Sequence, residues 1–318
     1  MKIQSVAILG AGAVGSYVIW GLSQKEEIEL GIIAEGERKE RLQQNGCKIN
    51  GKVYRPNVWT PKEACGVDLL IVALKYGALP EAMESIHKAV GEHTIVMSLM
   101  NGVNSEELIA KHIGKEKLLY SLIKVASHKE NDEYIFEPAT TIGIIFGEQT
   151  QPYQSERVKA VGELFENTGI HYRVTEDIME EIWSKFRLNV CNNLPQAILG
   201  AGVGCYEDSI HMNAIREGLR QELEAIAQAK GIDLSKVSAT SLHGSAVKKN
   251  ARFSTLQDLD AGRHTEIDMF SKTLADMGKE LGIATPYNEF TYHMIKALEE
   301  KNDGRFAYTG EEEPTWSK

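Results

Sequence analysis

Three glycines near the N-terminus have the clearest chemical meaning, in the run Gly10-Ala11-Gly12-Ala13-Val14-Gly15. The run follows the apolar segment from Val6 to Leu9 and opens an amphipathic stretch, so the GxGxxG pattern lies between an expected strand and an expected helix. There the first glycine permits a tight turn, the second lets the backbone approach a pyrophosphate, and the third lets the helix pack against the strand. The pattern predicts dinucleotide binding, with phosphates at the helix N-terminus; a plain strand-to-helix turn is the alternative.

A second constellation lies in an otherwise apolar stretch, where Lys185, Asn189 and Asn193 recur at i, i+4 and i+8. On a helix this spacing places the three side chains in one column. Burying an ammonium and two amides without partners costs on the order of several kcal/mol, so the column favours contact with a ligand. Beside a dinucleotide domain, Lys185 is the candidate proton donor for reduction of a carbonyl. The alternative is a lysine that extends to solvent above two structural asparagines.

The choice of dinucleotide depends on the residues after the second expected strand. Glu35 follows that strand, in the position where an acidic side chain binds the ribose hydroxyls of NAD. Arg38, Lys39 and Arg41 come next, and basic residues can instead surround the 2′-phosphate of NADP. By itself the carboxylate favours NAD. An exposed helix face is the alternative for the basic residues, and we favour it for Arg41.

Two polar residues follow the next expected strands. Lys75 comes directly after the apolar run from Leu69 to Leu74, and Asn101 comes directly after the run from Ile95 to Met100. Both are therefore expected at the carboxyl ends of strands, where open α/β sheets bind their ligands. For Asn101-Gly102 a simple turn is the alternative.

A polar cluster follows in the second half of the chain, at residues 254–258 and 263–268. Glu266 is expected at the start of a helix, where an ordinary first-turn carboxylate is the alternative to a role in the site. We interpret His264 as a structural hydrogen-bonding group.

The elements that must position these residues alternate between short apolar runs and amphipathic stretches in the first half of the chain. This alternation predicts a mostly parallel, doubly wound sheet. The expected strands are 6–9, 29–34, 69–74, 94–99, 118–126 and 142–146, and the expected helices are 13–23, 38–45, 79–90 and 105–112. After residue 176 the pattern becomes helical, with expected helices at 178–193, 214–230 and 265–281. We therefore expect a dinucleotide-binding domain at 1–175 and an all-helical substrate domain at 176–318.

The composition is that of a globular protein, with 42% hydrophobic and 25% charged residues in a chain of 318. The formal net charge of −10 argues against nucleic acid and anionic membranes as partners. The four cysteines are scattered, with no CxxC pair, which predicts neither a disulfide framework nor a metal site. No apolar run has the length of a membrane span and no signal-peptide pattern is evident, so we expect a cytoplasmic protein.

Together these motifs resemble those of the ketopantoate reductase family, within the superfamily that includes the 6-phosphogluconate dehydrogenases. The resemblance covers essentially the whole chain. It rests on the GAGAVG loop, the LK of Leu74-Lys75, the NG of Asn101-Gly102, the K-x3-N-x3-N from Lys185 to Asn193, the S-x-L-Q-D from Ser254 to Asp258, and the RHTEID from Arg263 to Asp268.

The resemblance implies a Rossmann-type α/β domain followed by an all-α domain like that of the 6-phosphogluconate dehydrogenases, with a substrate cleft between them. It implies NADPH-dependent reduction of 2-dehydropantoate to pantoate, in pantothenate and coenzyme A biosynthesis. By this resemblance Lys185 is the general acid, and Glu266 orients both the substrate and that lysine. The resemblance places Asn189, Asn193 and Ser254 on the substrate, and Lys75 and Asn101 at the cofactor and the reacting centre.

One position departs from the family pattern. Family members commonly carry an arginine at the end of the second strand, which holds the 2′-phosphate, whereas this chain has Glu35 there and Arg38 nearby. We expect NADP, with NAD left open. There are two alternative functions: reduction of another small branched 2-oxo acid, and dinucleotide sensing without turnover. The chain is expected to act as a monomer or a homodimer.

Overall fold

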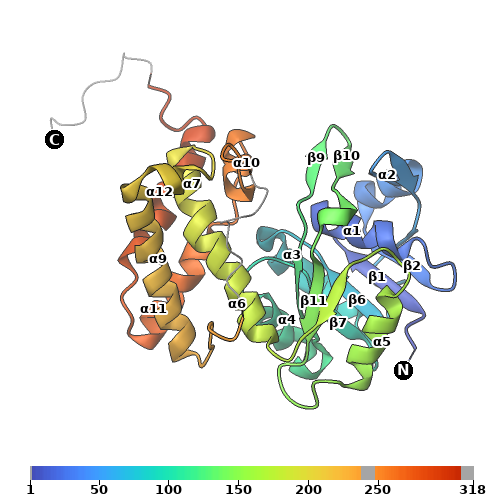
Figure 1. Cartoon of the computed structure of the whole chain (residues 1–318). Helices are drawn as coiled ribbons and strands as arrows, with labels where there is room; N and C mark the ends of the chain where they lie inside the picture. The colour runs from blue at the N-terminus through green and yellow to red at the C-terminus, as the bar shows by residue number, and fades with distance from the viewer. Residues whose placement is uncertain (1, 238–247, 309–318) are drawn as a thin grey trace. The chain divides into compact units, whose positions relative to one another are not determined.

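The computed structural model describes residues 2–237 and 248–308 (Figure 1). Tertiary contacts divide the chain into two compact units, Met1–Ile182 and Trp183–Lys318. The division falls inside helix α6 (Ile178–Leu188), a few residues after the boundary expected from the sequence. Each unit is described by itself below.

The first unit is built on a five-stranded, fully parallel sheet with the order β5-β2-β1-β6-β7. Its strands are β1 (Ser5–Leu9), β2 (Glu29–Ile33), β5 (Asn57–Trp59), β6 (Leu69–Val72) and β7 (Ile95–Ser98). All of these except β5 were expected from the sequence, and the doubly wound parallel sheet is confirmed.

Helices cover both faces of this sheet, which explains why its strands read as continuous apolar runs. Successive residues of β1 point to opposite faces: Val6 and Ile8 belong to one buried cluster, and Ala7 and Leu9 to another. The first cluster includes residues of α1 (Ala13–Leu22) and α5 (Glu156–Phe165), and the second includes residues of α3 (Leu79–Ala89) and α4 (Ser105–Ile113). Helix α2 (Gly36–Asn45) has no buried residue, and its sequence is strongly polar.

The last two expected strands of the first half do not extend the parallel sheet in the expected way. β8 (Tyr120–Lys124) and β11 (Gly143–Gly147) pair antiparallel, and β12 (Tyr172–Val174) pairs parallel with β11 in the same three-stranded sheet. The chain reverses between β8 and β11 through a ribbon, β9 (His128–Glu130) and β10 (Glu133–Ile135), which makes the pairing antiparallel. That ribbon forms a four-stranded sheet with β3 (Cys47–Ile49) and β4 (Lys52–Tyr54).

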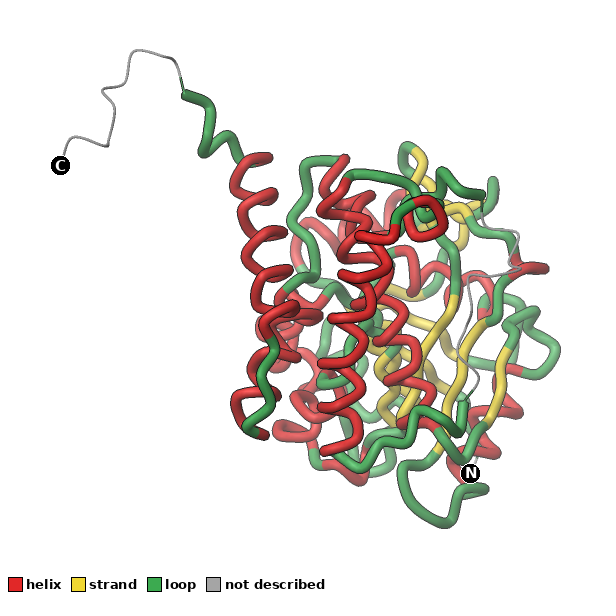
Figure 2. The backbone as a smooth tube through the Cα atoms, turned by 60° about the vertical axis from the view of Figure 1, so that its left-hand side comes forward, coloured by secondary structure: helices red, strands yellow, loops and turns green. Residues whose placement is uncertain are grey.

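In the second unit, every element of the described residues is a helix, as expected (Figure 2). After α6 come the π-helical segment η4 (Asn189–Asn193), α7 (Leu194–Leu199), α8 (Cys205–Asp208), α9 (Ile210–Ala229), α10 (Ser254–Asp260), the π-helical segment η5 (Asp268–Lys272), α11 (Thr273–Leu281) and α12 (Pro286–Asn302). Three short 3₁₀ turns, all in the first unit, complete the described elements: η1 (Tyr76–Ala78), η2 (Lys115–Lys117) and η3 (Pro138–Thr140).

The helix ends of the second unit follow local sequence signals. Ser209 caps α9, because its side chain accepts a hydrogen bond from the backbone N of Met212. Gly282 ends α11 in the left-handed conformation, which glycine adopts without steric cost. Two expected α-helices, 178–193 and 265–281, instead contain a π-helical turn, a rare feature that is frequent at functional sites.

Candidate active site

The glycine loop has the geometry of a dinucleotide cradle. Gly10 has a φ of +112°, and a Cβ there would lie 2.5 Å from the carbonyl oxygen of Ala73, the residue directly after β6. A Cβ on Gly15 would overlap the carbonyl oxygen of Gly10, whereas a Cβ on Gly12 would meet no heavy atom within 4 Å. Gly10 and Gly15 are therefore required by the fold itself. Gly12 faces open space at the start of α1, where a pyrophosphate fits against the first N–H groups of the helix.

The strand order brings the other first-unit candidates to the same edge of the sheet. Because β2, β1, β6 and β7 are adjacent and parallel, their carboxyl ends lie side by side (Figure 1). Glu35 follows β2 as the exposed N-cap residue of α2, Lys75 is exposed after β6, and Asn101 is half-buried after β7. The loops after β6 and β7 contact each other through Asn104, whose Nδ2 donates to the Tyr76 hydroxyl at 3.0 Å.

The basic residues of α2 differ in their surroundings. Lys39 forms an ion pair with Glu63 at 2.7 Å. Arg38 and Arg41 are exposed on the same helix. Arg38, which lies closer to Glu35 in the sequence than Arg41, is therefore a better candidate than Lys39 for an exposed cation beside that carboxylate.

A buried polar network closes the base of the loop that carries Asn101. Ser98, the last residue of β7, and Ser105, the first residue of α4, join their hydroxyls at 2.8 Å. The Ser105 hydroxyl also donates to the buried carboxyl of Glu106 at 2.7 Å. Burial raises the pKa of Glu106 to about 7. This network was not predicted from the sequence, because in the local pattern Ser98 is an ordinary strand-end residue and Glu106 is an ordinary first-turn carboxylate.

In the second unit, the expected column is partly buried and partly π-helical. Lys185 is half-buried on α6, while Asn189 and Asn193 are buried in η4. The Nδ2 of Asn193 donates to the Oδ1 of Asn189 at 3.2 Å, so the two amides share one face, as their spacing predicted. The aromatic rings of Trp183 and Phe186 pack edge to face beside this column.

The elements that carry the other candidates pack against the same segment. η4 contacts both α10 and η5, and Phe186 of α6 stacks on Phe270 of η5 with ring centroids 6.1 Å apart. Ser254, the first residue of α10, is exposed. The fold thus brings the elements of the column, of Ser254 and of the Glu266 segment together, although they lie far apart in the sequence.

Gln196 holds the backbone that leads to Ser254. This fully buried side chain on α7 donates to the carbonyl oxygen of Ala251 and accepts from the backbone N of Phe253, both at 2.9 Å. Gln196 was not among the residues predicted from the sequence. A lone amide in the apolar run from Leu194 to Leu199 was the available signal.

Glu266 is half-buried and lies just before η5, not inside the first turn of a helix as the sequence predicted. The helix starts later because the Thr265 hydroxyl accepts from the backbone N of Ile267, which makes a local turn ahead of it. His264 is exposed and its ring contacts Asp303 at 3.0 Å, which agrees with the structural interpretation of this histidine.

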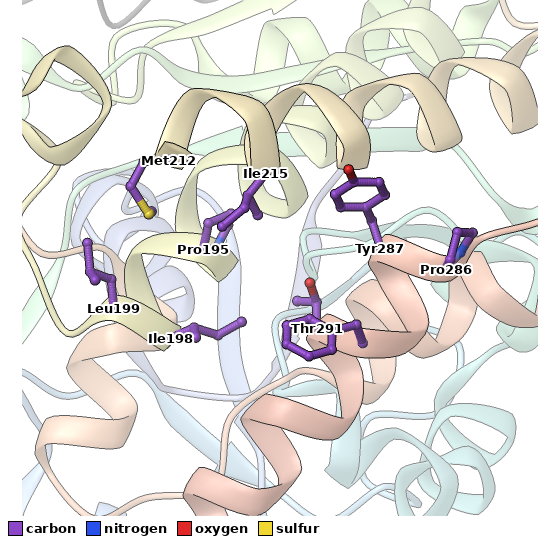
Figure 3. A pocket seen from close by; sticks show the side chains of 9 residues that line it. Pro195, Ile198, Leu199, Met212, Ile215, Pro286, Tyr287 and Thr291 are labelled. Atoms are coloured by element: carbon purple, nitrogen blue, oxygen red, sulfur yellow. The ribbon is translucent and has the colours of Figure 1, made fainter. Parts of the chain in front are cut away.

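A separate apolar pocket of about 410 Å³ lies in the second unit (Figure 3). None of the candidate residues lines it; the lining residues are Pro195, Ile198, Leu199, Met212, Ile215, Pro286, Tyr287, Phe290 and Thr291. The lining offers two hydroxyls and no cation, so it provides no counter-charge for the carboxylate of an oxo acid. The pocket is therefore distinct from the Lys185 column, which carries an ammonium and two amides.

Across 2–237 and 248–308, no group of three His, Cys, Asp or Glu side chains is placed to hold a metal ion. Burial raises the pKa of the Cys47 thiol to about 11 and that of the Cys191 thiol to about 12. All four cysteines are free. Within the same residues, no helix combines the length and apolar character needed to cross a membrane.

Comparison with known proteins gives a consistent result along the chain. Residues 6–147 match the model of "Ketopantoate reductase PanE/ApbA", and residues 177–299 match its C-terminal counterpart. A 2-dehydropantoate 2-reductase of Mesorhizobium japonicum is 25% identical over 321 residues, covering 92% of this chain and 97% of the relative.

Solved structures show the same fold. The 2-dehydropantoate 2-reductase of Geobacter metallireducens is 26% identical with a TM-score of 0.77, covering 92% of this chain and 99% of that one. D-mandelate dehydrogenase, solved with NADH and anilino(oxo)acetate, is 21% identical with a TM-score of 0.81, covering 94% and 99%. The two family matches, which together cover most of the chain, show that it belongs to the ketopantoate reductase family of NAD(P)-dependent oxidoreductases.

Proposed function

We propose that this protein reduces the ketone of 2-dehydropantoate to the hydroxyl of pantoate, as a step of pantothenate and coenzyme A biosynthesis. The observation that carries the proposal is the Lys185 column, in which an ammonium precedes two hydrogen-bonded, buried amides. The names of the curated relatives support the choice of substrate.

The chemistry requires one hydride on the carbonyl carbon and one proton on the carbonyl oxygen. A bound reduced nicotinamide dinucleotide supplies the hydride. Lys185 donates its proton to the oxygen as negative charge develops there, and solvent restores the ammonium afterwards. The amides of Asn189 and Asn193 and the hydroxyl of Ser254 bind the polar groups of the substrate, and Glu266 orients the substrate hydroxyl and the lysine.

The cofactor is held by the first unit. Residues 10–15 bind the pyrophosphate, because Gly12 leaves the approach to α1 open. Lys75 and Asn101 contact the cofactor near the reacting centre, and Asn101 also contacts the substrate. We assign NADPH as the cofactor, with the exposed guanidinium of Arg38 as the partner of its 2′-phosphate.

A second candidate function is reduction of another small branched 2-oxo acid, and NADH is a second candidate cofactor. Glu35 favours NADH, because an exposed carboxylate after β2 repels a 2′-phosphate and accepts hydrogen bonds from ribose hydroxyls. The D-mandelate dehydrogenase of the same fold, solved with NADH and anilino(oxo)acetate, agrees with this alternative. A pocket that differs by one or two methyl groups changes selectivity by only about 1 to 3 kcal/mol.

A panel of 2-oxo acids assayed with NADPH and with NADH tests both candidates. The proposal expects the highest kcat/KM for 2-dehydropantoate with NADPH. Oxidation of NADPH by other 2-oxo acids but not by 2-dehydropantoate would overturn the substrate assignment. Equal or higher efficiency with NADH would overturn the cofactor assignment.

A further inference from the structure

A buried glutamate on α12 holds the short segment that carries Glu266. Glu299 is 2% exposed, and its Oε1 accepts hydrogen bonds from the backbone N and from the Oγ of Thr265, both at 2.7 Å. The Thr265 Oγ in turn accepts a hydrogen bond from the backbone N of Ile267 at 3.2 Å. The side chain of Thr265 therefore bridges the backbone on the two sides of Glu266.

Glu299 is a charged acceptor. Burial raises its pKa, but hydrogen bonds from Lys296 and Thr265 outweigh burial and bring the pKa below its usual range. The Lys296 Nζ lies 2.7 Å from the Oε2 of Glu299, and the Nδ1 of His264 lies 3.7 Å from the same oxygen. Hydrogen bonds to an ionised carboxylate are stronger than those between neutral groups, so Thr265 is held firmly.

The residues after Glu266 are also attached to α12. Ile267 is fully buried, and the Oδ1 of Asp268 accepts from the Tyr292 hydroxyl at 3.2 Å. The Lys296 Nζ lies 3.8 Å from the Oδ2 of Asp268. An apolar side chain at position 299 would bury similar area without directional bonds, so these contacts specify the orientation of the segment and not only its packing.

We infer that Glu299 is a positioning residue for Glu266, acting through the amide and hydroxyl of Thr265. This inference rests on the proposed function, in which the Glu266 carboxylate orients the substrate and Lys185. The contacts that α12 makes with Thr265 and with Asp268 fix the backbone on both sides of Glu266. Loss of the bridge displaces the carboxylate, and a displacement of about 1 Å costs up to about 100-fold in rate.

Thr265→Val removes the hydroxyl and keeps the shape of the side chain, and Thr265→Ser keeps the hydroxyl. In the full-length protein, Thr265→Val is expected to lower kcat by about 10- to 100-fold. The dissociation constant of the dinucleotide, measured by nicotinamide fluorescence, stays unchanged. Thr265→Ser is expected to retain a kcat close to that of the wild type. If Thr265→Val does not fold, the isosteric variant Glu299→Gln is measured instead. It is likewise expected to lower kcat and to leave the dissociation constant of the dinucleotide unchanged.

Glu222→Gln is the matched control for loss of a buried carboxylate that contacts α12. Glu222 is also buried and accepts from the backbone N of Tyr287 at 2.7 Å and of Asn288 at 3.0 Å, at the opposite end of that helix. This variant is expected to lower the thermal midpoint and leave kcat unchanged. A Thr265→Val variant that loses stability in the same way, with unchanged kcat and KM, would overturn the positioning role.

Crystal structures of the wild type and of Thr265→Val separate this inference from the proposed function. A displaced Glu266 carboxylate in the variant is the expected result, and an unmoved one would overturn the inference even if kcat falls. A wild type that reduces no 2-oxo acid would overturn the proposed function, and the two structures would still decide the positioning role.

Discussion

Asn193 donates a hydrogen bond to Asn189 at 3.2 Å inside a π-helical turn, and both side chains are buried. The pair follows Lys185 in the same run of helix, with Asn189 four residues and Asn193 eight residues after the lysine. Each amide fixes the orientation of the other, so the two are expected to bind substrate as a unit.

The first prediction concerns this pair. Asn189→Ala and Asn193→Ala are each expected to raise the KM for the oxo acid by roughly tenfold, because loss of either amide leaves the other unoriented. The double variant should be little worse than either single one, since members of a coupled pair are non-additive. Steady-state kinetics of the three variants measures the coupling, and strictly additive effects would show that the amides act independently.

Lys185→Ala should lower kcat by about 100- to 10,000-fold, because the developing alkoxide loses its proton donor. Binding of the dinucleotide to the first unit should not change, which fluorescence titration checks. Lys272→Ala is the control: this exposed lysine forms an ion pair with Asp276 on the helix surface, and its loss should leave kcat intact. Normal turnover by Lys185→Ala would remove the catalytic assignment and favour a dinucleotide-sensing protein.

The glycine loop predicts two different outcomes for one kind of substitution. Gly15→Ala should prevent correct folding of the loop, because its Cβ overlaps the Gly10 carbonyl oxygen. Gly12→Ala should fold normally, since its Cβ meets no protein atom within 4 Å, but it should bind the dinucleotide poorly because the methyl occupies the approach of the pyrophosphate. Thermal unfolding and dinucleotide titration separate the two effects. Unimpaired binding by Gly12→Ala would place the phosphates elsewhere.

Cofactor preference should depend on Glu35 and Arg38. Arg38→Ala is expected to raise the KM for NADPH and leave the KM for NADH unchanged, because only NADPH has the 2′-phosphate. Glu35→Ala should lower the KM for NADPH and raise the KM for NADH. Arg41→Ala, on the exposed face of the same helix, is the matched control and should affect neither. Equal losses with both cofactors in Arg38→Ala would assign that arginine a structural role.

Glu106 predicts a pH dependence of stability. Burial raises the pKa of its carboxyl from 4.5 to about 7, so the native state binds more protons than the unfolded state between these values. The contribution of the Glu106 carboxyl to the free energy of unfolding is fully present below pH 4.5 and is lost as the pH rises through about 7. The loss is on the order of 3 kcal/mol.

Glu106→Gln removes that titration and keeps the shape of the side chain. Urea unfolding of both proteins at about pH 5 and about pH 8 should show the wild type losing more stability than the variant over this range. Tyr120 and Glu107, the ionisable groups near this carboxyl, are present in both proteins. Parallel pH profiles would indicate that Glu106 is ionised or solvated in the native state.

Local sequence determined much of this protein. The glycine loop, helices α1 to α4 and the common face of Asn189 and Asn193 follow from residues within a few positions of one another, because turns and helices are made by short-range bonds. Helix α5 was not expected from the sequence. The polar residues at the ends of β6 and β7 could be predicted for the same reason, once the apolar runs were recognised as parallel strands.

Only the tertiary structure decided the partners that are distant in the sequence. Glu299 binds Thr265 across 34 residues, and Gln196 binds Ala251 and Phe253 across 55 and 57. The antiparallel pairing of β8 with β11 and the short strands β3, β4, β9 and β10 were equally hidden, because segments of three residues show no periodicity. The local pattern specifies which residues could do chemistry. Their supports depend on which buried polar groups meet when separate helices and strands pack, and no local pattern contains that information.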